Sequence, residues 1–203
     1  MDDALAGAGA ARPGATWEMP RPPATIIPLP GLAFPTAALI FVLTAVVGGW
    51  LAVLQFAHVA FGAAWTIVDL FMGLVIGPLM PRMSPQARLE LSSRLMPQMA
   101  VLMPTLVTVT LVSGFQLSLK LGTINTAHPY HTWVLASFAV VGVMALVALG
   151  VNEPTNLAVL FEMRKPRPDL ELIGRLMRRF IYSSAVLGLM QLGTLIIMAR
   201  LAS

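Results

Sequence analysis

Residues 36–80 read TAALIFVLTAVVGGWLAVLQFAHVAFGAAWTIVDLFMGLVIGPLM, an apolar stretch of 45 residues in which Asp69 is the one formal charge. The rest of the chain has a similar character, since 57% of all residues are hydrophobic and 11% are charged. Soluble globular domains carry about 25% charged residues. The sequence therefore predicts an integral membrane protein and excludes a soluble enzyme.

This first stretch has two interpretations. As one helix it would be about 67 Å long, roughly twice the thickness of the hydrocarbon core of a bilayer. As a hairpin it would turn near Gly48 and Gly49 and give two spans. A turn that meets water usually carries polar residues, and Val46–Leu51 has none. One long first helix is therefore the favoured prediction, with the hairpin as the alternative.

Three further apolar segments predict membrane spans. We expect them at Met99–Leu119, after Pro97, at Thr132–Val151, before Asn152, and at Phe180–Leu201. Each has about the 20 apolar residues that a membrane-crossing helix needs.

A short amphipathic segment precedes the last span. Leu170, Ile173, Leu176 and Met177 have helical spacing and follow Asp169, a residue type that caps helices. This pattern predicts a short helix lying in the membrane interface.

The fold expected from these segments is an all-α integral membrane protein. It would be a four-helix transmembrane bundle over residues 36–203, or a five-helix bundle if the first stretch is a hairpin. Residues 1–35 are rich in Ala, Gly and Pro, a composition that predicts an extended N-terminal tail.

Basic residues are concentrated in two connecting segments, 81–96 with three and 152–179 with six. The segment between them, 122–131, has only Lys120 at its edge. Basic loops stay in the cytoplasm. We therefore expect a multi-pass protein of a bacterial-type inner membrane, with loops 81–96 and 152–179 cytoplasmic. Topology explains the net charge of +4, so nucleic acid is not an expected partner.

The first stretch also carries a polar pattern. Seven residues spaced alternately three and four apart share one helix face: Gln55, His58, Gly62, Trp65, Asp69, Met72 and Ile76. Weaker polar faces occur at Thr110, Ser113 and Leu117, and at Ser184, Leu187, Gln191, Thr194 and Met198. Ionisable groups in a membrane face the bundle interior, so these faces predict a moderately polar interior.

His58 has a functional and a structural interpretation. Neutral imidazole binds haem iron, and Gly62, one turn on, would leave room for a flat macrocycle. Alternatively, His58 only bonds a neighbouring helix. His131 begins the third span and could supply a second axial ligand, whereas His128 is expected to be a solvated loop histidine.

Asp69 and the methionines also leave alternatives open. Asp69 could relay protons, or could only bond a helix partner such as Gln191. Thioethers bind Cu(I), and Met96, Met99 and Met103 share a helix face. Methionine also fills gaps in apolar cores, so copper is the less favoured interpretation.

Several short motifs resemble the copper-resistance D (CopD) family and the HemJ-type protoporphyrinogen oxidases. They are FAHVAFGAAW at Phe56–Trp65, LVSGF at Leu111–Phe115, and the segment from Leu121-Gly122 to Pro129-Tyr130. The resemblance covers about residues 50–150. It implies a four- or five-helix bundle with His58 as a haem b ligand. HemJ-type enzymes resemble one another in a lysine of the third helix, and Thr132–Val151 has none, so oxidase activity is not expected.

Three functions remain. The first is a haem b-binding membrane protein for electron transfer, with His58, Gly62, Trp65 and His131 at the cofactor and His58 and His131 on the metal. The second is an accessory subunit of a larger membrane complex, with other membrane subunits as partners and no chemistry of its own. The third is a copper-handling membrane protein.

Overall fold

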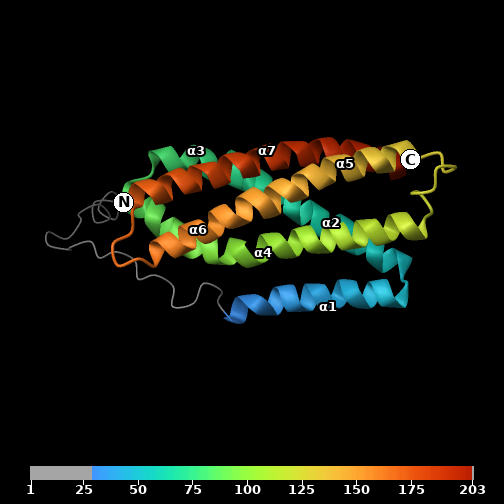
Figure 1. The fold of residues 1–203 in the computed structure, drawn as a ribbon, viewed down its shortest axis with the longest axis horizontal. Helices are drawn as coiled ribbons and strands as arrows, with labels where there is room; N and C mark the ends of the chain where they lie inside the picture. Colours follow the sequence, from blue (N-terminus) through green and yellow to red (C-terminus); the bar gives the residue numbers. More distant parts are fainter. Residues whose placement is uncertain (1–28, 203) are drawn as a thin grey trace, which may run out of the picture.

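The computed structural model describes residues 29–202, and this part of the chain is a bundle of helices without strands (Figure 1). The elements in chain order are η1 (Leu29–Leu32), α1 (Ala33–Gly48), α2 (Leu51–Phe71), η2 (Met72–Ile76), α3 (Gly77–Leu79), η3 (Met80–Arg82), α4 (Pro85–Lys120), α5 (His131–Val147), η4 (Ala148–Asn152), α6 (Glu153–Met163) and α7 (Leu170–Ala202). η2 and η4 are single π-helical segments, and η1 and η3 are 3₁₀ turns.

Consecutive elements join into four long rods. In the described part of the chain, four helices are long and apolar enough to cross a membrane: Leu51–Arg82, Pro85–Lys120, His131–Met163 and Leu170–Leu201. Rods of 32 to 36 residues are about 48–54 Å long. Successive rods are antiparallel, and α1 lies beside the bundle (Figure 1). The predicted all-α membrane bundle is thus confirmed.

The favoured single helix over residues 36–80 is wrong, because the chain forms the hairpin. Gly49 has a φ of 70°, a left-handed conformation that favours glycine. Its N–H bonds the Val46 carbonyl, and the Trp50 N–H bonds the Ala45 carbonyl, both at 3.2 Å. This pair of bonds is a Schellman motif. It satisfies the end of α1 without polar turn residues, which is why their absence was misleading.

Helix α1 is a short addition to the four rods. Its 16 residues span about 24 Å. Ala38 and Val42 pack in one cluster with Ala57 of α2 and Val109 of α4. Helical structure begins at η1, before the predicted boundary at residue 36. The rest of the predicted tail lies outside the described residues.

The second and third rods are longer than the predicted spans. α4 begins at Pro85, capped by Ser84, whose hydroxyl accepts a 3.2 Å bond from Ala87 N, and it continues through Pro97 and Pro104. The predicted loops 81–96 and 152–179 are therefore largely helical. Hydropathy marks only the part of a helix inside the bilayer, so it cannot locate a helix end in the polar region beyond.

Two of the prolines follow π-helical segments. Pro78 stands just after η2 and Pro154 just after η4. Proline removes one helical hydrogen bond and clashes with the preceding turn, and a π-segment is one way a membrane helix adjusts to this. The third rod therefore passes Asn152, where the sequence predicted an end.

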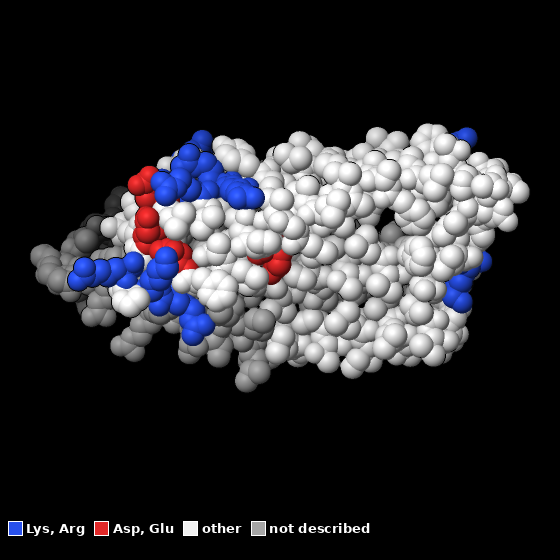
Figure 2. All heavy atoms as spheres, viewed as in Figure 1, with Lys and Arg blue, Asp and Glu red and all other residues white. Residues whose placement is uncertain are grey.

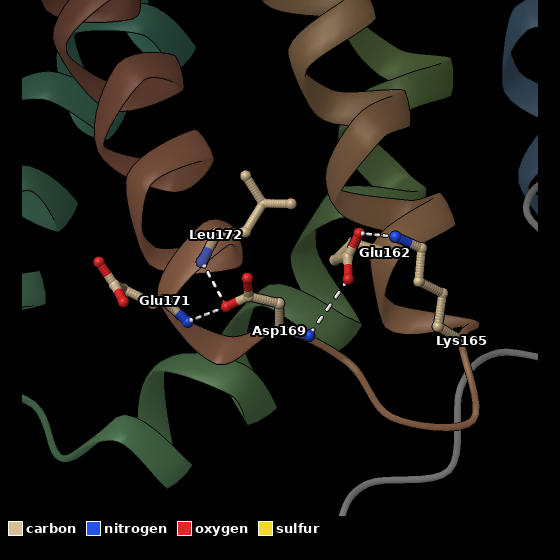
Figure 3. Close-up of polar contacts among 5 residues, drawn as sticks. All are labelled: Glu162, Lys165, Asp169, Glu171 and Leu172. Atoms are coloured by element: carbon tan, nitrogen blue, oxygen red, sulfur yellow. Dashed lines mark hydrogen bonds and ion pairs between the residues drawn. The ribbon is translucent and has the colours of Figure 1, made fainter.

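The fourth rod begins with a capped turn rather than a separate interfacial helix (Figure 3). Asp169 Oδ1 accepts 2.9 Å bonds from the backbone N–H groups of Glu171 and Leu172, so the predicted cap is confirmed. Glu162 at the end of α6 accepts a bond from Asp169 N and pairs with Lys165 at 2.6 Å. The apolar side chains of Ile173 and Met177 are buried in the core, which is why this segment continues into the bundle.

Small residues bring the first and fourth rods close together. A Cβ added at Gly73 would lie 2.6 Å from the Ala185 Cα, and one at Gly188 would lie 2.9 Å from a Leu70 methyl. Close backbone approach through small residues is typical of packing between membrane helices. It places η2 directly against α7.

Charge is strongly segregated along the bundle (Figure 2). Arginines and lysines gather at one end, where the segments 81–96 and 152–179 lie, and few charges lie at the other, where α4 ends with Lys120 and α7 with Arg200 in its last turn. The two basic segments thus share one side of the apolar part of the bundle. We call this the basic end.

Candidate functional site

The polar face predicted on the first stretch points into the bundle along most of α2. Trp65, Asp69 and Met72 are fully buried, and His58 and Gly62 are partly buried. Gln55 is exposed, whereas Leu54 and Ala57 of the same turn are fully buried, so the polar face turns outward at this position. The faces on α4 and α7 are also confirmed, since Ser113, Ser184 and Gln191 are buried.

Asp69 lies at the centre of the buried polar residues. Its Oδ2 accepts a 3.0 Å hydrogen bond from the Gln191 side-chain amide of α7, so the helix partner suggested by the sequence is confirmed. Ser184 and Trp65 also lie beside the carboxyl. Three buried atoms around it have no hydrogen-bond partner among residues 29–202: Asp69 Oδ1, Gln191 Oε1 and Trp65 Nε1. Unsatisfied buried polar atoms are uncommon, so three of them around one carboxyl make this place a candidate functional site.

A second group of polar side chains continues from Ser184 toward the basic end. Asn152, the last residue of η4, donates from Nδ2 to Ser184 Oγ at 3.1 Å. The Ser183 hydroxyl donates to Asn152 Oδ1. Asn152 and its neighbour Glu153 line a small cavity with Met103, Pro104 and Phe180. The buried polar residues thus continue from Ser184 to the first turn of α6.

His58 is held in a defined orientation between α2 and α4. Its Nδ1 lies 2.9 Å from the Thr110 carbonyl oxygen. A carbonyl only accepts hydrogen bonds, so Nδ1 must carry the proton, and in the neutral ring Nε2 then keeps its lone pair. The ring lies over Gly114, where an added Cβ would be 2.6 Å from His58 Cε1.

Gly62 and Trp65 contribute to packing around this site. A Cβ at Gly62 would meet the Thr110 methyl at 3.4 Å, so the glycine lies against α4. Trp65 is 2% exposed. Its indole lies beside the Asp69 carboxyl inside the bundle, not on the bundle surface. The structure therefore places these two predicted cofactor residues in the interfaces of α2.

The two remaining histidines lie at the end opposite the basic end. His128 Nδ1 accepts a 3.2 Å bond from Tyr130 N, and its ring packs against the Tyr130 ring. His131 is the first residue of α5, and its Nδ1 is buried without a partner among the described residues. The Nδ1 of His131 is thus a buried ring nitrogen whose hydrogen-bonding capacity these residues do not satisfy.

The methionines considered for copper lie in the hydrophobic core. Met96, Met99 and Met103 are at most 8% exposed and pack in one cluster with Met177 and Phe180. This placement corresponds to their use as apolar filling. The described residues contain no group of three or more His, Cys, Asp or Glu side chains that could hold a metal ion.

Two asparagines were missed by the sequence interpretation. The sequence pattern places Asn152 and Asn156 in a loop, whereas both are buried on helices. Asn156 sits against α4, with one amide atom 3.1 Å from Met96 O and the other 2.8 Å from Ala100 N. Only with Nδ2 toward the carbonyl do donors meet acceptors. The four-residue spacing of the two asparagines was the available signal, because it puts both on one helix face.

Comparison with protein-family models, with curated proteins and with solved structures gives no match to this chain. The resemblance to the CopD and HemJ-type proteins therefore stays a prediction from the short motifs.

Proposed function

We propose that this membrane protein binds haem b and serves electron transfer, on its own or as a subunit of a larger membrane complex. The observation that carries the proposal is the 2.9 Å contact between His58 Nδ1 and the Thr110 carbonyl. Histidines that ligate metals almost always donate their second ring nitrogen to a carbonyl or carboxylate. His58 has this arrangement inside an apolar helix.

The donor chemistry of His58 fits haem iron. The Thr110 carbonyl fixes the tautomer, so Nε2 offers a lone pair, and the bond makes the imidazole a stronger ligand. Gly114 leaves the space that the ring occupies. Haem supplies a one-electron carrier whose potential depends on its axial ligands and on burial. His58 would hold the iron, and Thr110 and Gly114 would orient His58.

Further support comes from the same part of the bundle. His131 is the half-buried first residue of α5, and its ring is the one that would supply a second axial bond. Figure 2 shows a hollow in the uncharged part of the bundle, between α5 and α4 as they are drawn in Figure 1. A single ligand from His58 is the simpler arrangement, with His131 as the second ligand if the iron is six-coordinate.

The proposal is tested by purifying the full chain from a host that makes haem b. Absorption spectra before and after dithionite should show a Soret band and sharpened bands on reduction. A pyridine haemochrome assay should identify haem b at about one per chain. Protein that is folded and monodisperse but carries no haem after expression with added haem precursor would refute it.

The second candidate is an accessory subunit without a cofactor. The rods are about 48–54 Å long, whereas the hydrocarbon core is about 30 Å, so the helices extend beyond the bilayer at the basic end. An extension with exposed Arg175 and Arg178 is a suitable surface for another subunit. Size measured in mild detergent tests this, because co-purifying subunits would support it and a haem-free monomer would contradict both candidates.

A further inference from the structure

We propose that Asp69 carries a proton that it shares with Gln191, and that this carboxyl is a proton-exchange site reached from Glu153 at the start of α6. The proposal does not depend on haem. It rests on the pairing of buried donors and acceptors around Asp69 and on the polar residues that lead to it.

The first step concerns the atoms of the Asp69–Gln191 pair. Gln191 Nε2 donates to Asp69 Oδ2 at 3.0 Å. The two remaining oxygens, Asp69 Oδ1 and Gln191 Oε1, are both acceptors, and both are buried without a partner among residues 29–202. One proton on Asp69 Oδ1 turns it into a donor to Gln191 Oε1. A carboxylic acid and a primary amide then form two parallel hydrogen bonds.

The ionised form has hydrogen-bond donors beside it but no cation. The groups that interact with the Asp69 carboxyl in the described residues are Ser184, Gln191 and Trp65, and none of them is charged. An isolated carboxylate is expensive in an apolar interior. A neutral acid bonded to Gln191 avoids that cost without a cation.

Trp65 adds a position for water. Its Nε1 is the third buried atom without a partner among the described residues, and it is a donor only. Once the acid and amide have paired, this N–H is left to bond a water oxygen beside the carboxyl. Buried waters occur where polar groups are otherwise unsatisfied. Such a water is the species that takes the proton from Asp69 or returns it.

Polar side chains continue from this position to Glu153. Ser184 lies beside Asp69, and its hydroxyl accepts the 3.1 Å bond from Asn152. Asn152 and the half-buried Glu153 line a cavity of about 10 Å³, which is about the space of one water molecule. In each exchange a water gives a proton to Asp69 Oδ1 or takes it back and in turn exchanges that proton with Glu153, and no other bond or electron is involved.

The experiment is infrared difference spectroscopy of the full chain in detergent or bilayers, during transfer from H₂O to D₂O. A carboxylic acid C=O band should be present in the native protein and absent in Asp69→Asn. It should shift in D₂O. Glu153→Gln should slow that shift, by up to about a hundredfold, the lower range of what a positioned acid or base contributes. Glu90→Gln, at an exposed glutamate of α4, is the matched control and should exchange at the native rate.

The alternatives are distinguishable. Identical carboxylic acid bands in native protein and Asp69→Asn would show an ionised Asp69 and overturn the proposal. A band that does not shift in D₂O would overturn proton exchange. Equal rates in Glu153→Gln and Glu90→Gln would overturn the route. If Asp69→Asn does not fold, Gln191→Leu must move the same band, because it removes both hydrogen bonds, and an unmoved band would contradict the acid–amide pair.

Discussion

His58 of α2 and Thr110 of α4 are joined by a hydrogen bond of 2.9 Å between the imidazole Nδ1 and the backbone carbonyl. The same carbonyl also accepts a 3.2 Å bond from the Ser113 hydroxyl. The bond links two residues that are 52 positions apart in sequence, and so joins α2 to α4. It also fixes which ring nitrogen of His58 keeps a lone pair. It leaves Nε2 of His58 as the nitrogen available to a metal.

Gly114→Ala should disturb this histidine. The new methyl would lie 2.6 Å from His58 Cε1 and 2.8 Å from Nδ1, so the ring must move and its bond to Thr110 must weaken. We expect a shifted or weakened Soret band in the haem-loaded protein. Gly142→Ala is the control, because nothing lies within 4 Å of a Cβ there. Native spectra in both variants would contradict the described position of the ring.

The Asp69–Gln191 pair should contribute to stability as a unit. In a double-mutant cycle with Asp69→Leu and Gln191→Leu, we expect a coupling free energy of about 0.6–1.7 kcal/mol, the range of hydrogen bonds between membrane helices. Each single variant leaves one buried polar group unpaired, whereas the double variant leaves neither. Unfolding in mixed detergent measures the four stabilities, and a coupling near zero would show that the contact contributes nothing.

Gly73→Ala should destabilise the bundle by about 1–3 kcal/mol, the usual cost of overpacking. The added Cβ would lie 2.6 Å from the Ala185 Cα, so η2 and α7 must separate. Thermal unfolding in detergent provides the measurement. Gly142→Ala again serves as control and should be unchanged or slightly more stable, since alanine favours helix. Equal stability of the two variants would argue against the close η2–α7 contact.

The sequence was sufficient for the parts of the fold that depend on apolar length. The number of long rods, the non-helical connection after Lys120 and the cap at Asp169 follow from hydropathy and local hydrogen bonding. The hairpin at Gly49 was misjudged, because its backbone is satisfied by a Schellman motif. Lys120, distant in sequence, lies with its Nζ 3.1 Å from the place of a Cβ at Gly49, a contact that no local pattern reveals.

The candidate sites, too, were only partly predictable from the sequence. Helical periodicity placed His58, Trp65 and Asp69 on one face, and it named Gln191 as a partner for Asp69. The π-segments before Pro78 and Pro154 could not be expected, because proline usually ends a helix. The π-segment η4 keeps the third rod continuous past Asn152 and so brings Asn152 to Ser184. The polar connection to Glu153 could not be predicted from the sequence, because it depends on this continuation of the helix.

The membrane orientation can be tested by labelling, since the chain contains no cysteine. We expect Thr126→Cys to react with a membrane-impermeant thiol reagent added to intact cells, and Arg167→Cys to react only after lysis. Both positions are exposed, and the basic end should be cytoplasmic. The reverse labelling pattern would invert the topology.

The central claim, that His58 holds a haem b, is tested most directly by the Soret band of His58→Ala. The matched control is His128→Ala, which removes a histidine from the loop between α4 and α5. Both variants should insert in the membrane and elute as the native protein does. We predict that the Soret band is lost in His58→Ala and kept in His128→Ala. An unchanged Soret band in a folded His58→Ala variant would contradict the account.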